Sequence, residues 1–235
     1  MRTSIFQIVA VSSLVALAAA QWPSAAPAAG QSVRIVGGQS PATKRGDLWY
    51  SNNLATEAPL PDNYVAPTPQ DAIDIKTYGS YRRASYDSNN LFFKAMMGVE
   101  RAFWTLFNHI KGRNIPMTAP VEFDFRNADN SRKFLGELDV SWTMSFLYKN
   151  PSQGATGNAG SDVWVADTTE TTYISIGQEG SFSYSLLNLG VDRLREALRS
   201  QNKWVAAGEP RFLGYNSPYT WYKWAEIQIP VKLAQ

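Results

Sequence analysis

The chain is predicted to fold as an α+β domain built from two successive strand–helix–strand–strand units. The first observation is a repeat, because residues Ile73–Tyr81 and Ile174–Phe182 both follow the order Ile-x-Ile-x-x-x-Gly-Ser-aromatic. The second is that a run with helical spacing follows each copy, and two alternating, strand-like runs follow each helix. We therefore expect an approximate twofold relation between the two halves of one domain.

In the first unit, residues 81–86 are predicted to form a second strand, and a long helix is predicted to follow from about Asn90. Gly112 and the proline soon after it end the helix, because proline cannot continue it. Apolar residues at steps of three and four share one helix face: Phe92, Met96, Val99, Phe103, Leu106 and Ile110. Strands are then expected at Val121–Phe125 and Asp139–Tyr148, where apolar and polar residues alternate.

A second apolar ridge on this helix lies off the main face. Phe93, Met97 and Trp104 stand roughly 100–140° round from it on the helical wheel. The ridge is either additional core under a second covering element or the border of a cleft. The pattern leaves both interpretations open.

The second unit is predicted to repeat this order. A strand at Phe182–Leu186 follows the Gly-Ser turn, and a helix follows from about Leu187 to Ser200. The last two strands are expected at Arg211–Tyr215 and Tyr222–Val231. Between the two units, residues 150–161 are rich in Gly, Asn and Ser and are expected to form a flexible loop.

The residues before position 71 lack this pattern. Residues 1–20 are typical of a secretory signal peptide, with one charge at Arg2, a short apolar run and three alanines at the end. We therefore expect export, by secretion or to a lumen, the plastid lumen included. Residues 21–70 are rich in Pro and Ala and are expected to form a linker, or an arm over the domain at 71–235. No later stretch is apolar and long enough to cross a bilayer, so no stable membrane insertion is expected after signal removal.

The composition excludes several classes of function. A net charge of +2 is too small and too scattered for a nucleic-acid partner. The chain has no cysteine, which excludes disulfides, zinc–thiolate sites and cysteine nucleophiles. Its one histidine, His109, cannot form a multi-histidine metal site within one chain. No nucleotide-binding loop, nucleophile elbow or His-Glu-x-x-His motif occurs, so no enzyme activity is indicated, and no protein partner can be named.

Binding of a small molecule is better supported than catalysis. The second ridge on the first helix and the aromatic run at residues 215–224 supply flat apolar surface. Small-ligand sites are mostly apolar clefts with a few polar groups, so a planar, hydrophobic, weakly anionic ligand would suit these walls. A heavily aromatic core with edge strands would account for the same residues, and this alternative stays open.

Two motifs carry a resemblance to a known family. Residues 107–114, Phe-Asn-His-Ile-Lys-Gly-Arg-Asn, precede Ile-Pro-Met-Thr-Ala-Pro-Val at 115–121, and Gly-Tyr-Asn-Ser-Pro stands at 214–218. These segments strongly resemble the SOUL/p22 haem-binding protein family, and the resemblance covers about Asp71 to Val231. It implies a twisted antiparallel β-barrel of two pseudo-twofold related repeats, flanked by two helices. It also implies reversible binding of haem or another tetrapyrrole in an apolar cleft between the first helix and the loop before the final strands.

The resemblance and the second ridge together place the predicted binding residues on these two elements. They are Met97, Arg101, Phe103, Trp104, Phe107 and Lys111 on the helix, and Tyr215, Tyr219 and Trp221 on the loop. The implied function is the carriage, buffering or sensing of a tetrapyrrole. Two other classes stay open: an enzyme that modifies a tetrapyrrole, for example by removing its metal, and a barrel that binds a protein partner without tetrapyrrole.

The single histidine is a weak candidate for an axial ligand of haem iron. On the helical wheel His109 lies on the side opposite Trp104 and Met97. It stands in the last helical turn, where exposed carbonyl groups favour a protonated imidazole. We therefore expect a surface histidine, and we expect His109→Ala to leave haem affinity nearly unchanged.

Overall fold

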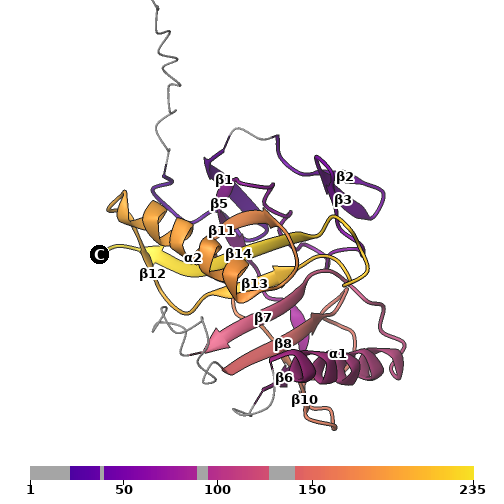
Figure 1. The fold of residues 1–235 in the computed structure, drawn as a ribbon. Helices are drawn as coiled ribbons and strands as arrows, with labels where there is room; N and C mark the ends of the chain where they lie inside the picture. The colour runs from indigo at the N-terminus through magenta and orange to yellow at the C-terminus, as the bar shows by residue number, and fades with distance from the viewer. Residues whose placement is uncertain (1–21, 38–39, 89–94, 127–140) are drawn as a thin grey trace, which may run out of the picture.

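The computed structural model describes residues 22–37, 40–88, 95–126 and 141–235, with the side chains of 95–97 excepted. One long sheet forms its centre, and two helices, α1 (Ala95–Lys111) and α2 (Tyr184–Arg199), lie against it (Figure 1). Each neighbouring pair in the sheet is antiparallel. The strand order is β1 (Gln31–Val36), β5 (Ile73–Tyr78), β11 (Thr171–Glu179), β14 (Trp224–Leu233), β13 (Arg211–Gly214), β7 (Val121–Arg126), β8 (Ser141–Leu147), β6 (Arg82–Asp87), β10 (Val163–Asp167) and β9 (Gly157–Asn158), with β12 (Trp204–Ala206) also paired to β14.

The two copies of the sequence repeat lie side by side as β5 and β11. They pair antiparallel, with Ile75 opposite Ile174 and Ile73 opposite Ile176. All four isoleucines are buried in one apolar core. The strand predicted for each copy is confirmed, and so is the α+β class with two helices on an antiparallel sheet. The twofold relation between the halves stays a prediction.

Both helices pack on the same apolar core. α1 lies against β6, β8 and β10, and α2 lies against β11, β12 and β14. Leu106 and Ile110 of α1 and Leu194 of α2 are buried in that core, as their spacing predicted. Gly190 allows α2 to approach β14 closely, because a Cβ at this position would stand 2.8 Å from the Ile227 side chain. The predicted start of the first helix, at residues 90–94, lies outside the described residues.

One strand of the second unit was predicted wrongly. The stretch Phe182–Leu186 contains the start of α2, which begins at Tyr184. Ser183 caps this helix, because its hydroxyl accepts a hydrogen bond from the backbone N–H of Leu186 at 3.1 Å. Alternating apolar residues imitate a strand here, but the cap decides the local structure. The loop expected at 150–161 also includes β9, which pairs with β10, a strand that the sequence pattern did not predict.

The described residues between 22 and 70 lie as an arm on the domain. β1 adds a strand beside β5, while β2 (Thr43–Arg45), β3 (Leu48–Ser51) and β4 (Leu54–Ala55) form a separate small sheet. Residues 54–68, here called the strap, then contribute Leu54, Leu60 and Val65 to a second buried cluster. β14 lies between the helix-covered core and the cluster under the strap. Ile227 of β14 belongs to the first, and Trp224 of β14 belongs to the second.

The sheet bends so that strands far apart in its order come together on the strap side. β5 and β6 are far apart in the strand order, but only residues 79–81 separate them in the chain. The paired strands follow an open path from β1 to β9 within the described residues. In the same part of the chain, no helix is both long and apolar enough to span a membrane.

Candidate functional site on helix α1

Three aromatic side chains form one cluster on α1. The rings of Phe103 and Phe107 are stacked, with centroids 6.1 Å apart. The Trp104 ring stands edge-on to both, at 5.6 Å from each. We call these three residues the α1 aromatic cluster. They meet because residues four apart lie on one face of a helix, and the intervening tryptophan borders that face.

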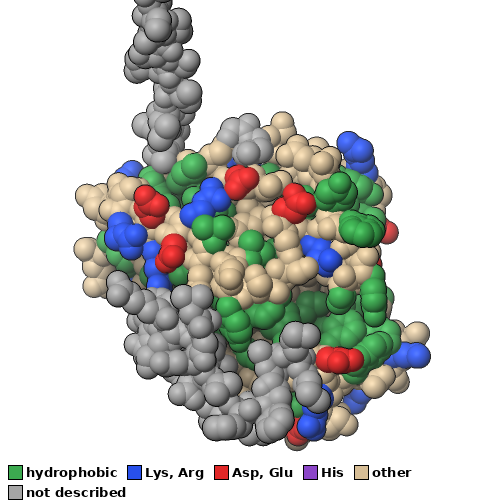
Figure 2. Space-filling view, viewed as in Figure 1, with side chains coloured by type: hydrophobic (Ala, Val, Ile, Leu, Met, Phe, Trp, Pro, Cys, Tyr) green, Lys and Arg blue, Asp and Glu red, His purple; other side chains and the backbone are tan. Residues whose placement is uncertain are grey.

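The cluster is anchored on one side and open on the other. Phe103 contacts Phe146 of β8 edge-on at 5.2 Å and packs against the helix-covered core. Trp104, by contrast, is 51% exposed. Figure 2 shows hydrophobic side chains gathered in the region of α1, around a hollow in the surface. The structure therefore gives α1 an anchored, partly exposed apolar surface against which an apolar ligand could lie.

Two cations of the predicted site share the exposed face of α1 with Trp104. Arg101 and Lys111 are both exposed. At 100° per residue they stand about 60° and about 20° from Trp104, and ten residues separate them by about 15 Å along the helix axis. Positive charge is thus available on either side of the cluster along the helix. Met97 belongs to α1, but its side chain lies outside the described residues.

The three loop residues of the predicted site are not brought together with the α1 aromatic cluster. Tyr215 is buried, and its hydroxyl donates to Glu226 Oε1 at 2.7 Å, so it faces the strap side of the sheet. The alternation that continues from β13 turns Tyr215 inward, so this structure does not place it beside the α1 aromatic cluster. Tyr219 and Trp221 are 92% and 95% exposed, and the described residues show no ring contact between them and the cluster.

His109 is not a surface residue, so that expectation is wrong. It is buried, and its Nε2 shares a hydrogen bond of 2.7 Å with the hydroxyl of Tyr148. Burial lowers the pKa of His109 to about 4, and the positive charge of Arg113 adds to the effect. The imidazole is therefore neutral near pH 7 rather than protonated. Its Nε2 is already engaged by the Tyr148 hydroxyl.

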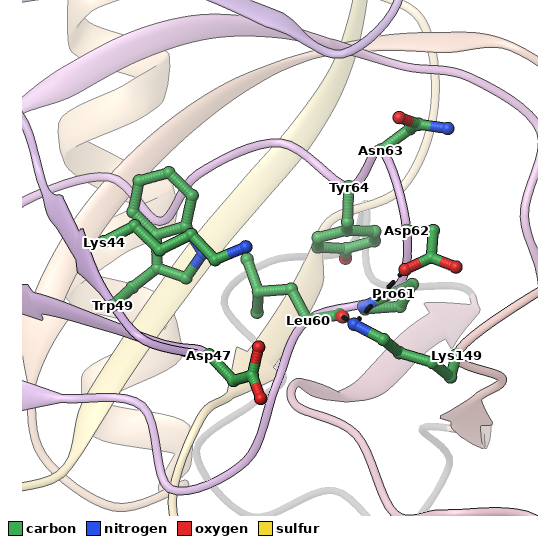
Figure 3. Close-up of a pocket in the computed structure, with 9 residues that line it drawn as sticks. All are labelled: Lys44, Asp47, Trp49, Leu60, Pro61, Asp62, Asn63, Tyr64 and Lys149. Carbon is green, nitrogen blue, oxygen red and sulfur yellow. Dashed lines mark hydrogen bonds and ion pairs between the residues drawn. The ribbon is translucent and has the colours of Figure 1, made fainter.

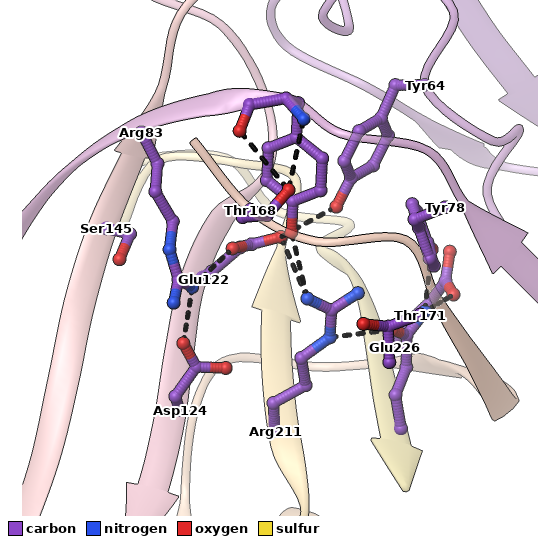
Figure 4. A network of polar contacts seen from close by, with 12 residues as sticks. Tyr64, Tyr78, Arg83, Glu122, Asp124, Ser145, Thr168, Thr171, Arg211 and Glu226 are labelled. Carbon is purple, nitrogen blue, oxygen red and sulfur yellow. Dashed lines mark hydrogen bonds and ion pairs between the residues drawn. The ribbon is translucent and has the colours of Figure 1, made fainter. Parts of the chain in front are cut away.

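A buried polar network fills the sheet face under the strap (Figure 4). Glu122 of β7 accepts hydrogen bonds from the hydroxyls of Tyr64 at 2.9 Å and Tyr81 at 2.7 Å. Arg211 reaches the same oxygen at 3.2 Å, and Arg83 reaches the other oxygen at 3.1 Å. Tyr64 belongs to the strap, so the strap completes the surroundings of this carboxylate.

A second buried carboxylate has its own set of partners. Glu226 of β14 accepts from Lys76 Nζ at 2.9 Å, from the hydroxyl of Tyr215 and from the hydroxyl of Ser175. The backbone N–H of Thr68 in the strap donates to it at 2.8 Å. Burial alone would raise the pKa values of Glu122 and Glu226, but the nearby cations and hydrogen bonds outweigh it and hold both below their ordinary value.

These pKa directions argue for a structural role of the network. Both carboxylates stay ionised near neutral pH, and each is paired with a buried cation. A general acid needs a raised pKa and access to substrate, and neither glutamate has these properties. Buried charges are tolerated only when paired and hydrogen-bonded, and each of these two carboxylates has both kinds of partner. Sequence reasoning found the alternation of Glu122 with apolar neighbours but could not show that its polar side is also buried.

The strap, the small sheet and Lys149 line a separate pocket of about 290 Å³ (Figure 3). Its lining carries two lysines and two aspartates, and no residue of α1 takes part. Lys149 Nζ forms an ion pair with Asp62 at 3.2 Å and donates a hydrogen bond to the Leu60 carbonyl at 3.1 Å. The lining residues are Lys44, Asp47, Trp49, Leu60, Pro61, Asp62, Asn63, Tyr64 and Lys149. The sequence did not predict this pocket, because it depends on how the arm folds over the domain.

Comparison with known proteins identifies the family. A family model described as "SOUL heme-binding protein" matches residues 61–230, which is most of the chain. The chain belongs to the SOUL haem-binding protein family. The match includes α1 and the end of the strap. No curated protein matches the sequence.

Among solved structures, the SOUL chain is similar in fold to two structures of EcmrR. The crystal structure of the EcmrR C-terminal domain is 14% identical with a TM-score of 0.53, and the match covers 69% of this chain and 98% of that one. A cryo-EM structure of an EcmrR–DNA complex is 11% identical with a TM-score of 0.52, covering 69% of this chain and 57% of that one. At these identities the likeness concerns the fold alone.

The SOUL-like motif after α1 ties three elements together. The backbone N–H of Ile115 closes the helix end on the Ile110 carbonyl at 2.9 Å. The Thr118 hydroxyl donates to the Leu147 carbonyl of β8 at 2.6 Å, and the Ala119 N–H donates to Pro59 of the strap at 2.9 Å. The motif therefore fixes the end of α1 against the sheet and the strap. Because the α1 aromatic cluster belongs to this helix, the same contacts help to fix the position of the cluster.

Proposed function

We propose that this protein binds haem or another tetrapyrrole reversibly on the α1 aromatic cluster, for carriage, buffering or sensing. The observation that carries the proposal is the contact of three aromatic rings on α1, with one of them half exposed. Membership of the SOUL family supports it. We further propose that the sheet closes as a barrel with two halves related by an approximate twofold axis.

The chemistry of the cluster fits a tetrapyrrole. Such a ring is planar and apolar, so it can lie against Phe103, Trp104 and Phe107. Its carboxylate groups would be attracted by Arg101 and Lys111, which are exposed on the same side of the helix. Haem would add an iron centre able to take axial ligands. His109 is not included as such a ligand, because its Nε2 is hydrogen-bonded to Tyr148.

We propose binding rather than catalysis. The two buried glutamates are paired with cations beneath the strap, and no group of three or more His, Asp or Glu side chains suited to a metal occurs in the described residues. A tetrapyrrole-modifying enzyme remains the alternative to be tested. We also propose that residues 1–20 direct export, with the mature protein starting near Gln21.

An absorbance titration of the purified protein with haem and with protoporphyrin tests the proposal. We expect saturable binding of at least one of them, with a shifted and intensified Soret band. The ligand extracted afterwards should be chemically unchanged. Absence of saturable binding for both ligands would reject the proposed function, and recovery of a metal-free or ring-opened product would favour the enzyme alternative. His109→Gln should bind like the unmodified protein.

A further inference from the structure

The loop between β13 and β14 displays three aromatic side chains to solvent. Tyr219 is 92% exposed, Trp221 is 95% exposed and Tyr222 is 55% exposed. We call residues 216–223 the aromatic loop. Large aromatic side chains that stand fully in water forgo the favourable burial of their apolar area. Three of them within four consecutive positions therefore call for a partner surface.

Hydrogen bonds hold the aromatic loop in this conformation. The Glu57 carboxylate, from the arm, accepts from the hydroxyls of Ser217 and Thr220, each at 2.9 Å, and from the Ser217 backbone N–H. Asn216 accepts from the Trp224 backbone N–H at 2.7 Å and donates to the arm. The base of the loop is thus fixed, and its tip projects the aromatic rings outward.

The tip of the aromatic loop carries no charged side chain that would oppose its insertion into a bilayer interface. Between positions 210 and 225 the sequence contains no aspartate or glutamate. Its two cations are Arg211, which is buried in the polar network, and Lys223 at the base of the loop. The Glu57 carboxylate is occupied by hydrogen bonds from the loop. The tip therefore combines apolar rings with polar Tyr and Trp groups and no carboxylate.

We propose that the aromatic loop docks the protein on a lipid bilayer, with Tyr219 and Trp221 entering the headgroup region. Tyr and Trp favour this region because each has an apolar ring and a polar group. A bilayer accepts a convex tip without a matching cavity, and insertion to the depth of a few side chains does not require a membrane-spanning segment. The binding is peripheral and reversible.

The exposed area favours a bilayer over a folded protein partner. An aromatic side chain buries roughly 150–250 Å², so the three exposed rings offer roughly 400–600 Å² in all. A stable protein interface buries about 800 Å² on each partner, together with complementary shape. A projecting tip of this size falls short of that. Partitioning into a bilayer interface depends on the inserted side chains alone.

Vesicle co-sedimentation tests the inference. The chain from Gln21 onward, which contains the whole described fold, is mixed without tetrapyrrole with vesicles of phosphatidylcholine, alone or with phosphatidylserine. We expect binding to both kinds of vesicle, and a blue shift of tryptophan fluorescence. The double variant Tyr219→Ala/Trp221→Ala should lose at least about tenfold in partition coefficient, the change expected when two inserted aromatic contacts are removed. Its thermal unfolding midpoint should not change, because both side chains stand in solvent.

Trp164→Ala is the matched control, because Trp164 is a 56% exposed tryptophan on β10, outside the loop. It should bind vesicles like the unmodified chain. The inference fails if the unmodified chain does not co-sediment with either kind of vesicle. It also fails if the double variant co-sediments with vesicles to the same extent as the unmodified chain. It also fails if the loop instead drives concentration-dependent self-association that the double variant abolishes. Because no tetrapyrrole is present, a failure of the proposed function leaves these results unaffected.

Discussion

Replacing Lys76 with methionine will test how the polar interior is stabilised. Lys76 and Glu226 are both fully buried, and they approach to 2.9 Å. In Lys76→Met the carboxylate keeps its hydrogen bonds but loses its cation. Breaking a buried pair by removing one partner typically costs about 3–5 kcal/mol, because a charge is left uncompensated in a medium of low polarity. We expect a loss of this size in the free energy of unfolding at pH 7.

The variant will also respond to pH in the opposite direction. In the unmodified protein, the pKa of Glu226 is below its ordinary value, so its stabilisation is present above that value and lost as pH falls. Without Lys76, burial is expected to raise the pKa of Glu226 above its ordinary value. Folding then favours the protonated carboxyl, so the deficit relative to the unmodified protein shrinks as pH falls from 7 towards 5.

Urea unfolding followed by tryptophan fluorescence, at pH 7 and pH 5, measures both effects. Lys76→Met/Glu226→Gln should recover a large part of the loss at pH 7, since the glutamine is neutral and can still accept the Thr68 and Tyr215 hydrogen bonds. The coupling energy between the two sites should exceed about 2 kcal/mol. A single variant that loses less than about 1 kcal/mol, or a double variant as unstable as the single one, would refute the reasoning.

Two further predictions concern other buried positions. Because the pKa of His109 is low, the unfolded chain binds a proton between pH 6.5 and about 4 while the folded chain does not. The free energy of unfolding should therefore drop by about 1–3 kcal/mol as the pH falls through this range. His109→Gln should show less of this acid loss when urea unfolding is compared at pH 7 and pH 4.5. Gly177→Ala should lower the free energy of unfolding by about 2–3 kcal/mol, because its Cβ would stand 2.2 Å from the Thr68 carbonyl oxygen of the strap. Gly79→Ala is the control, because its Cβ would meet only Ala29, at 3.5 Å. Calorimetry measures both variants, and equal unfolding midpoints would contradict the close approach at Gly177.

Periodicity in the sequence was enough to predict the elements that pack by one apolar face. α2, β5 and β11 bury the apolar residues that their spacing marked, and α1 and β7 bury Leu106, Ile110, Phe123 and Phe125 in the same way. Where a single polar residue decides the structure, periodicity failed. The cap at Ser183 converts an apparent strand at 182–186 into the start of α2. Such local hydrogen bonds outweigh a short hydrophobic pattern.

The candidate site could be predicted only where it lies within one element. Phe103, Trp104 and Phe107 meet because they share a helix, and the sequence already shows that spacing. Tyr215 is buried beside Glu226 because the strap covers this side of the sheet, and the strap comes from a segment with no periodic pattern. The pairing of Lys76 with Glu226 joins residues far apart in the chain, and no local pattern reports it.

The central claim is that the α1 aromatic cluster holds a tetrapyrrole, and titration of two tryptophan variants tests it most directly. Trp104 and Trp164 are 51% and 56% exposed, so they offer comparable rings on different elements. Followed at the Soret band, Trp104→Ala should weaken binding by about 1–3 kcal/mol, roughly 5–150-fold in dissociation constant. Trp164→Ala should bind like the unmodified protein. Unchanged affinity in Trp104→Ala, with weakened binding in Trp164→Ala, would contradict the claim and move the site away from α1.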